Sequence, residues 1–328
     1  MTTTIAPEHS TTPSMPPPAA DPSVAVRVAI LVPCRNEVVT IAAVIAGFQR
    51  HLPRAEIWVC DNNSTDGTAG KALEAGAHVI EETRPGKGSA VRRLFACVAA
   101  DVYVMVDGDG TYDAATAGTL VRELLERRLE MVVARRVTPQ AGLARAYRSG
   151  HQLGNRAFAA LMRRLFGVQV TDPFSGYRAF SRRFVQSFPA LSNGFEIETE
   201  LTVHALELGM TIRELPTAYG ERPEGSTSKL DTYRDGARIA LTLMHLYEQV
   251  RPFRFFGTVA LLLVVLALAL GLPVVAEFAE TGLVRRFPTA ILASAIMVLA
   301  SLSATCGAIL DSVARARREA KRLAFLAA

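Results

Sequence analysis

Three aspartates in the stretch MVDGDGTYD (residues 105–113) have the types and spacing that could do chemistry. Asp107 and Asp109 stand one residue apart, directly after an apolar run, and Asp113 follows them. Two carboxylates this close at the end of a buried strand repel each other unless a cation lies between them. Hard carboxylate oxygens favour Mg²⁺ or Mn²⁺, which take further ligands from water and substrate phosphates. The cluster therefore predicts a metal-bound diphosphate at Asp107 and Asp109, with Gly108 between them allowing close approach.

Two other interpretations of the aspartate cluster are possible. The stretch begins like a calcium-binding loop, but Tyr112 and Gly118 occupy the places where that loop needs a glycine and a bidentate glutamate. Alternatively, the aspartates are turn and helix-capping residues. Capping suits Asp113, which precedes a helical pattern. It suits Asp107 and Asp109 poorly, because capping does not explain two adjacent carboxylates at a buried strand end.

Short β-rich runs alternate with helical patterns over the first part of the chain. The expected strands are 24–32, 56–60, 77–82, 102–106 and 130–134. The segments with helical spacing are 38–52, 68–77, 88–100 and 114–128. This alternation predicts βαβ units and an α/β fold, with a Rossmann-like, mostly parallel sheet flanked by helices. Ligands of such sheets bind at the carboxyl ends of the strands, where the aspartate cluster stands.

Two apolar runs near the C-terminus predict a transmembrane hairpin. Residues 255–276 and 287–310 carry no charged side chain, and each is long enough to cross a hydrocarbon core of about 30 Å as a helix. The alternative is a pair of core helices in a soluble protein, but these are usually shorter and keep a polar stripe. Lys and Arg flank the outer ends of the hairpin more than its connector, which predicts cytoplasmic placement of the preceding domain and of a basic tail at 311–328.

The remaining composition excludes several classes of protein. Residues 1–24 lack an apolar signal-peptide core and are rich in Pro, Thr and Ser, so they are expected to form a disordered tail. The four cysteines form no CxxC pair, which indicates reduced thiols and neither a zinc site nor a disulfide framework. The net charge of +5 concentrates beside the apolar runs. We therefore expect anionic lipid, and no nucleic acid, as the partner of this charge.

Five motifs occur in a recognisable order: PCRNE, DNNSTDGT, RPGKGSA, DGDGTYD and TDPFSGYRAF. In this order they resemble family 2 glycosyltransferases of the GT-A fold. The later stretch RPEGSTSKL (222–230), followed by two spans, is similar to polyprenyl-phosphate glycosyltransferases, the group that includes dolichyl-phosphate mannose and glucose synthases. The resemblance covers residues 25–254. It implies a GT-A catalytic domain at 25–230. Apolar residues at helical spacing, interspersed with charged ones, also predict a juxtamembrane amphipathic helix at 231–254, before the two spans. The alternative is an ordinary helix packed on the domain.

The resemblance also implies a reaction and its partners. A single sugar would pass with inversion from a nucleotide sugar to a polyprenyl phosphate in the membrane. A UDP-hexose donor is preferred to GDP-mannose, because GFEIETELTVHALE and RPEGSTSK look closer to relatives that use UDP-sugars. Mg²⁺ or Mn²⁺ would be the cofactor. Relatives with two spans imply a homo-oligomer, a tetramer.

Matched positions receive roles from the same resemblance. The residues that would line the nucleotide pocket are Pro33, Arg35, Glu37, Asp61 and Lys87. The metal and diphosphate ligands would be Asp107 and Asp109, with Gly108 between them. The cations that would meet the acceptor phosphate and donor diphosphate are Arg136, Arg148, Arg222 and Lys229. Before Arg136, Ala134 and Arg135 replace the Gly and Ser of the relatives' GSR-type motif. The motif that would close the edge of the active site contributes Asp172, Ser175 and Arg178.

A lipid phosphate acceptor changes what the protein must supply. A phosphomonoester is largely ionised at neutral pH, since its second pKa is about 6. This acceptor therefore needs alignment more than it needs a general base. Asp172 and Glu200 are the candidates for a base, and the alternative is that each holds a sugar hydroxyl or an arginine.

Two alternative functions share parts of this pattern. A processive polysaccharide synthase has the same fold, but it is expected to carry a QxxRW segment, and the chain's single tryptophan is Trp58 in the second strand. Two spans also make a poor channel for a polymer. A non-catalytic, membrane-anchored protein that binds sugar nucleotides would be expected to lose its metal or phosphate residues, which this chain retains.

Overall fold

A computed structural model of the 328-residue chain describes residues 26–137, 163, 167, 171–194, 196–220, 222–223, 241, 244–245 and 247–327. The expected tail at 1–24 therefore lies outside the described residues, as do two of the predicted cations, Arg148 and Lys229. Only residues 241, 244–245 and 247–254 of the expected juxtamembrane segment are described.

Seven strands form one sheet in the order β3-β2-β1-β4-β6-β5-β7. Their bounds are β1 Val28–Cys34, β2 Glu56–Asp61, β3 His78–Glu81, β4 Val102–Met105, β5 Met131–Val137, β6 Arg178–Ser181 and β7 Ile212–Ala218. Strand β6 runs antiparallel to β4 and β5, and the other pairs are parallel. The predicted mostly parallel α/β sheet and its first five strands are confirmed. The sequence did not predict β6 and β7.

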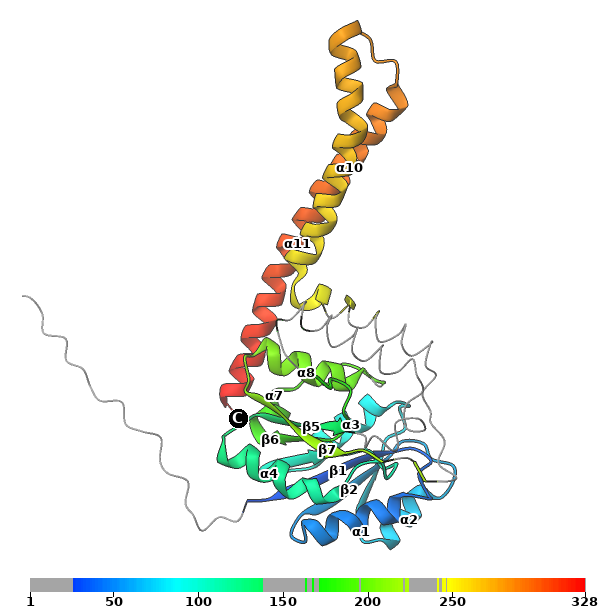
Figure 1. The fold of residues 1–328 in the computed structure, drawn as a ribbon, viewed down its shortest axis with the longest axis vertical. Coiled ribbons are helices and arrows are strands. Elements are labelled where there is room, and N and C mark those ends of the chain that lie inside the picture. The colour runs from blue at the N-terminus through cyan, green and yellow to red at the C-terminus, as the bar shows by residue number, and fades with distance from the viewer. Residues whose placement is uncertain are drawn as a thin grey trace, which may run out of the picture.

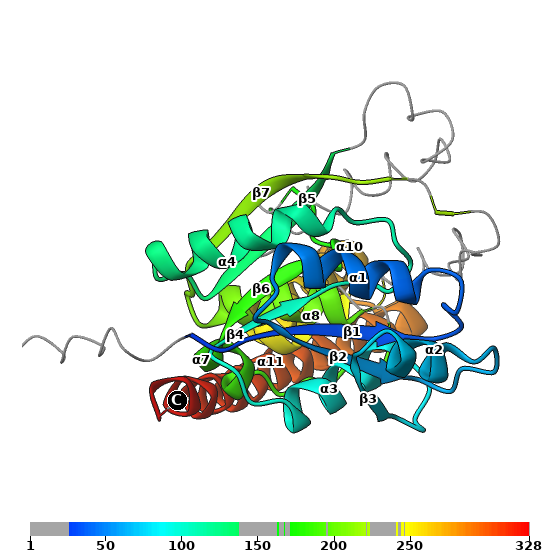
Figure 2. The same ribbon diagram turned by 90° about the horizontal axis from the view of Figure 1, so that it is seen from below.

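Helices cover both faces of this sheet (Figures 1 and 2). The bounds are α1 Ile41–His51, α2 Thr68–Glu74, α3 Lys87–Cys97, η1 Ala114–Thr116, α4 Ala117–Glu126, α7 Arg182–Ser187 and α8 Ile197–Glu207. Alternate residues of a strand point to opposite faces. In β1, Ile30 packs in a core with α1 and α4, whereas Leu31 packs in a second core with α3, α7 and α8. Burial on both faces explains why β1 is almost continuously apolar.

Two long helices project from the domain as a hairpin, α10 (Pro252–Thr281) and α11 (Phe287–Ala327) (Figure 1). Their most apolar windows have mean hydropathies of 2.9 and 1.9, and only 17% and 11% of the residues in those windows are buried. Helices in a soluble core are mostly buried, so α10 and α11 are better described as candidate membrane spans.

Small residues at heptad spacing hold this hairpin together. Ala260 and Ala267 of α10 are buried, as are Ala293, Ala300 and Gly307 of α11. A seven-residue repeat keeps one stripe of each helix facing its partner, and small side chains let the backbones approach. The packing is tightest at Gly307, where an added Cβ would lie 2.9 Å from the Cβ of Phe256.

Helix α11 continues beyond the predicted span and returns to the domain that carries the sheet. Residues 311–327, expected as a tail, are helical and contact α7. The Nζ of Lys321 lies 2.7 Å from the Oε2 of Glu207, at the end of α8. The guanidinium of Arg183 lies over the ring of Phe325, 4.9 Å from its centroid. The second helix of the hairpin is thus attached directly to the domain that carries the sheet.

Candidate active site

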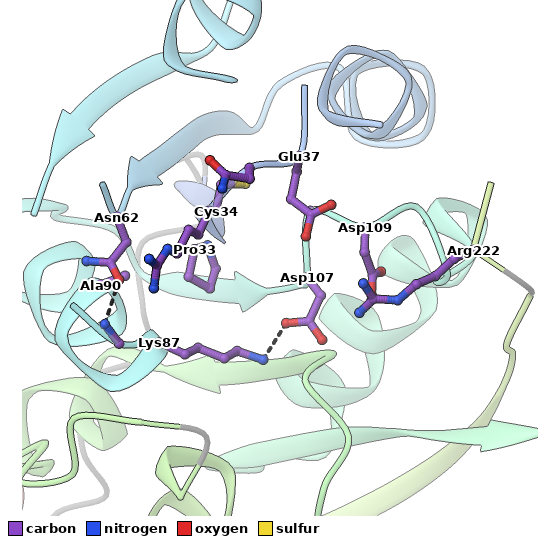
Figure 3. Close-up of a pocket in the computed structure, with 13 residues that line it drawn as sticks. Pro33, Cys34, Glu37, Asn62, Lys87, Ala90, Asp107, Asp109 and Arg222 are labelled. Carbon is purple, nitrogen blue, oxygen red and sulfur yellow. Dashed lines mark hydrogen bonds and ion pairs between the residues drawn. The ribbon is translucent and has the colours of Figure 1, made fainter. Parts of the chain in front are cut away.

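A cavity of about 460 Å³ opens at the carboxyl ends of β1, β2 and β4 (Figure 3). This is the edge where parallel α/β sheets bind ligands. The residues that line the cavity are Pro33, Cys34, Arg35, Asn36, Glu37, Asn62, Gly86, Lys87, Ala90, Asp107, Gly108, Asp109 and Arg222. Segments more than a hundred residues apart in sequence meet here. The cavity therefore brings together most of the described residues to which we assigned nucleotide, metal or diphosphate roles.

Lys87 is the first residue of α3, and it lies between two carboxylates. Its Nζ contacts Oδ1 of Asp107 and lies 2.5 Å from Oε1 of Glu198. Burial alone would lower the pKa of Lys87, but the charges of Asp107 and Glu198 raise it above its ordinary value. Burial also raises the pKa of Glu198, against the opposing effect of Lys87. The ammonium group therefore stays charged inside the wall of the cavity.

Asp109 is almost completely buried and has a different set of partners. Its Oδ1 accepts hydrogen bonds from the backbone N of Thr111 at 3.1 Å and from the Oγ1 of Thr111 at 2.6 Å. Its Oδ2 lies 2.7 Å from Nη2 of Arg222. Asp113, by contrast, caps the 3₁₀ turn η1 by accepting from the N of Ala115 at 2.9 Å. The capping role predicted for Asp113 is confirmed, which separates it from Asp107 and Asp109.

Two glycines are required by close contacts around these carboxylates. An added Cβ at Gly108 would collide with the Sγ of Cys34 on β1. An added Cβ at Gly176 would lie 2.5 Å from the Oδ2 of Asp107. Gly176 belongs to the TDPFSGYR motif, so this motif packs directly against the first aspartate of the pair. A larger residue at position 176 would therefore displace Asp107, and one at position 108 would press against β1.

Arg136 and Asp172 form a hydrogen-bonded pair that does not line the cavity. The Nε and Nη2 of Arg136 lie 2.8 and 2.7 Å from the two carboxylate oxygens, and its backbone N donates to Asp172 at 3.0 Å. Although burial raises the pKa of Asp172, the hydrogen bonds and charge of Arg136 hold it below its ordinary value. Of the two alternatives for Asp172, the structure therefore shows it holding an arginine.

The Arg136–Asp172 pair predicts a loss of stability in acid. Because the native pKa of Asp172 lies below the ordinary value of 3.8, the unfolded chain binds more protons than the folded chain between the two values. Stability from this pair is present above that window and is lost as the pH falls through it. In Asp172→Asn we expect the unfolding temperature to fall less steeply below about pH 4 than in the unsubstituted chain. Equal slopes in thermal unfolding scans at a series of pH values would contradict this assignment.

Arg178 and Glu200 hold backbone loops beside the site. Arg178 is fully buried and donates to Ser175 O at 2.8 Å, Pro173 O at 2.6 Å and Thr202 Oγ1 at 2.9 Å. The Ser175 hydroxyl donates to Ala134 O at 2.6 Å.

The carboxylate oxygens of Glu200 accept from the backbone N of residues 191 and 192. These contacts show a structural task for Glu200.

Strand β2 ends at Asp61, and Asn62 follows it. Asp61, predicted to line the nucleotide pocket, is not among the lining residues. Its Oδ2 accepts from Ser64 N at 3.2 Å, and its buried Oδ1 has no hydrogen-bond partner within the described part of the chain. Asn62, which the sequence did not single out, does line the cavity.

Asn62 fixes the loop that leads to Lys87. Its Nδ2 donates to Glu82 O at 2.8 Å and Arg84 O at 2.7 Å, and its Oδ1 accepts from Gly86 N at 2.7 Å. In Asn62→Asp, a carboxylate oxygen would face the two carbonyl oxygens. We expect a loss of about 1–3 kcal/mol in the free energy of unfolding at neutral pH.

Asn63→Asp is the matched control for this prediction. The exposed Asn63 donates to Thr83 O at 2.9 Å, so water can replace the lost bond and the effect should be smaller. Chemical unfolding of both variants measures the difference. Equal losses would show that the burial of Asn62 does not matter.

Glu198 is a charged residue that pairs with Lys87 beside Asp107 and that the sequence did not single out. It lies in the first turn of α8, where acidic residues commonly stabilise the helix N-terminus. This common role explains an acidic residue here without a contact to Lys87. Only the fold shows that Glu198 reaches Lys87, because 111 positions separate them along the chain (198 minus 87).

Comparison with known proteins identifies the family. The model of "Glycosyl transferase family 2" matches residues 29–188. Glycosyltransferase AglJ of Haloferax volcanii is 38% identical over 253 residues, which is 76% of this chain and 82% of AglJ. The chain belongs to glycosyltransferase family 2. It is therefore a transferase, as the five ordered motifs led us to expect.

Two further proteins are similar to this chain. The dolichyl-phosphate hexose transferase of Haloferax volcanii is 31% identical over 218 residues, covering 66% of this chain and 92% of that enzyme. A crystal structure of glucosyl-3-phosphoglycerate synthase from Mycobacterium tuberculosis, in complex with Mn²⁺, UDP and glucosyl-3-phosphoglycerate, aligns with a TM-score of 0.56 and 26% identity. The alignment covers 67% of this chain and 80% of that one. The structural alignment supports the predicted GT-A fold for the seven-stranded sheet of this chain.

Proposed function

We propose that this protein transfers a single hexose, with inversion, from a nucleotide sugar to a polyprenyl phosphate. The observation that carries the proposal is the cavity in which Asp107 and Asp109 meet Lys87 and Arg222, in a domain attached to a hairpin of candidate membrane spans. The named relative that transfers hexose to dolichyl phosphate supports a lipid acceptor. The solved neighbour with bound UDP supports a UDP-hexose over GDP-mannose as donor.

The two aspartates fit a site for Mg²⁺ or Mn²⁺. Both carboxylates border the same cavity, and among the described residues no group of three or more His, Cys, Asp or Glu side chains could hold a metal. A site with two hard oxygen donors suits a cation that takes its other ligands from water and a diphosphate. When bound, such a cation would supply positive charge against the developing charge of the leaving diphosphate.

Lys87 and Arg222 supply further positive charge on this chain's own side chains. Each contacts one of the two aspartates and borders the cavity. A donor diphosphate placed between them would accept charge-assisted hydrogen bonds from both. These bonds stabilise the leaving group more as its charge grows, which is how preorganised donors lower a reaction barrier.

The ends of β1 and β2 are suited to the nucleoside. Pro33, Arg35 and Glu37 line the cavity, as the sequence led us to expect. The Oδ1 of Asp61 is a buried acceptor without a partner in the described segments. A buried acceptor is stabilised when it receives a hydrogen bond. We propose that Asp61 accepts one from the base or ribose after a small local adjustment.

The hairpin and the contacts of the two candidate bases support a lipid phosphate as the acceptor. Asp172 and Glu200 already hold Arg136 and backbone amides. A lipid phosphate, ionised at neutral pH, can attack without losing a proton to the protein. We propose that Arg136, with Arg148 and Lys229 outside the described residues, aligns this phosphate.

We also propose the arrangement of the chain at the membrane. A catalytic domain at 25–230 and a juxtamembrane helix at 231–254 would precede spans at 255–276 and 287–310. The domain and both ends would face the cytoplasm, because Lys and Arg concentrate at the outer ends of the hairpin. A homo-tetramer would complete the assembly. Labelling of single introduced cysteines from either side of sealed vesicles tests the sidedness.

A donor panel tests the transfer reaction. Membranes that contain the protein are given polyprenyl phosphate, Mg²⁺ or Mn²⁺, and radiolabelled UDP-glucose, UDP-galactose, UDP-N-acetylglucosamine or GDP-mannose in turn. We expect one UDP-hexose to label the lipid fraction. If no nucleotide sugar labels lipid, the proposed function is wrong.

A further inference from the structure

Glu198 and Asp107 share one ammonium group inside the wall of the cavity. The side chains of Lys87 and Glu198 are 10% and 5% exposed, against 27% for Asp107. Glu198 lies in α8, an element that contributes no other residue to this contact. Its Oε2 is buried and has no hydrogen-bond partner among the described residues. Glu198 is therefore a buried carboxylate whose ion pair within the described residues is with Lys87, so its charge acts chiefly on that residue.

The charge balance around Lys87 differs from that around Arg222. Arg222 contacts the Oδ2 of Asp109. The Oδ1 of Asp109 accepts hydrogen bonds from two uncharged groups of Thr111. Lys87, however, has carboxylates on two sides, so Asp107 receives only a share of its charge. Of these two carboxylates, only Asp107 would contact Lys87 if the charge of Glu198 were removed. The ammonium group would then neutralise Asp107 more completely.

We propose that Glu198 is a positioning residue that takes up part of the charge of Lys87, which would otherwise act on Asp107 alone of these two carboxylates. This leaves Asp107 able to bind a divalent cation while Lys87 remains at the edge of the cavity, directed at the diphosphate. The inference rests on the proposed function, since it assumes that the cavity binds a nucleoside diphosphate with Mg²⁺ or Mn²⁺. It adds to that function a residue from outside the five ordered motifs, on a helix whose far end contacts α11 through Glu207.

The test measures how UDP binding depends on Mn²⁺, with no sugar transfer involved. The full chain in detergent is equilibrated with radiolabelled UDP across a series of Mn²⁺ concentrations, with GDP in a parallel series. In Glu198→Gln, we expect the Mn²⁺ concentration for half-maximal UDP binding to rise about tenfold, the size expected for one charge-assisted contact. An unchanged midpoint in a folded Glu198→Gln protein overturns the inference.

Two further variants show whether Glu198 acts through Lys87. In a Lys87→Met background, adding Glu198→Gln is expected to leave the Mn²⁺ midpoint where Lys87→Met alone puts it. The double variant removes both buried charges together, which avoids an unpaired carboxylate and protects folding. A second tenfold shift in the double variant would show that Glu198 acts by another route and would overturn the inference.

Glu200→Gln is the matched control on the same helix. Glu200 is also a buried carboxylate, but backbone amides hold it and no ion pair with Lys87 is observed. We expect its unfolding temperature to fall while its Mn²⁺ midpoint stays that of the unsubstituted chain. If both variants shift the midpoint equally, the effect is general damage to α8, and the inference is wrong.

Two remaining outcomes are also decisive. If Glu198→Gln does not fold, Glu198→Asp keeps the charge on a shorter side chain, and we expect an intermediate shift of the midpoint. An unshifted Glu198→Asp would then count against the role. If the unsubstituted chain binds neither UDP nor GDP at any Mn²⁺ concentration, the proposed function fails, and this inference fails with it. The behaviour of the unsubstituted chain thus distinguishes the two failures.

Discussion

Replacement of Asp109 by Asn is expected to lower the rate of sugar transfer by about 10²- to 10³-fold. The substitution keeps the size of the side chain but removes the charge that would bind the cation and that now pairs with Arg222. It leaves an amide against the hydroxyl and backbone N of Thr111, both of which donate to Asp109 Oδ1. Initial rates with saturating lipid acceptor, across a range of donor and Mn²⁺ concentrations, measure the loss.

Asp113→Asn is the matched control from the same motif. Asp113 caps the turn η1 and does not line the cavity, and Asn is a good capping residue. We expect transfer at close to the unsubstituted rate. If Asp109→Asn retains more than a tenth of the activity, or if Asp113→Asn loses as much as Asp109→Asn, the assignment of the metal and diphosphate site is wrong.

Replacement of Arg178 by Ala is expected to reduce the free energy of unfolding by about 3–5 kcal/mol. Arg178 is completely buried, and its guanidinium bonds Ser175 O, Pro173 O and Thr202 Oγ1. Truncation leaves these acceptors unpaired and creates a cavity beside β6. Because Gly176 packs against Asp107, we also expect a loss of UDP binding. Thermal unfolding and equilibrium binding with the full chain in detergent measure both effects.

Arg182→Ala provides the comparison for Arg178. The half-exposed guanidinium of Arg182 lies 4.0 Å from Asp101, and exposed pairs of this kind contribute little. We expect a change within about 0.5 kcal/mol. A similar small change for Arg178→Ala would show that the buried network does not hold the TDPFSGYR motif in place.

The first five strands could be predicted from the sequence because each is an apolar run followed by turn residues. Strand β6 is only four residues long and begins with the buried Arg178. Strand β7 contains charged residues and Pro216. Neither has the composition of a strand in a parallel sheet. Strand β6 depends on pairing with β4 and β5, and β7 depends on pairing with β5. These partners are distant in sequence, so local pattern could not reveal either strand.

The aspartate pair could be predicted because adjacent carboxylates at a buried strand end require a cation or a basic partner. The basic residues that contact the two aspartates could not be predicted to do so from the sequence. Lys87 and Arg222 each contact an aspartate through the fold, and Glu198 has an ordinary alternative role as a residue of the first helical turn. Asp61 and Asn62 are adjacent, and only the local course of the backbone decides which of them lines the cavity.

The end of the chain shows the same dependence on tertiary contacts. Residues 311–328 combine basic residues with alanines, a composition that suits a solvated tail as well as a helix. In the structure, residues 311–327 continue α11, because Lys321 pairs with Glu207 and Phe325 packs under Arg183. Helices gain most of their stability from such packing. This contact could not be inferred before the position of α8 was known.

The identity of the acceptor tests the central claim most directly. The purified chain in detergent is given a radiolabelled UDP-hexose, Mn²⁺, and equal concentrations of polyprenyl phosphate and 3-phosphoglycerate, so that lipid and soluble phosphate acceptors compete. We predict that the label appears as a polyprenyl-phosphate sugar in the organic phase, and that Asp109→Asn abolishes it. Label on 3-phosphoglycerate alone, or none on lipid with any donor of the panel, would contradict a lipid-phosphate glycosyltransferase.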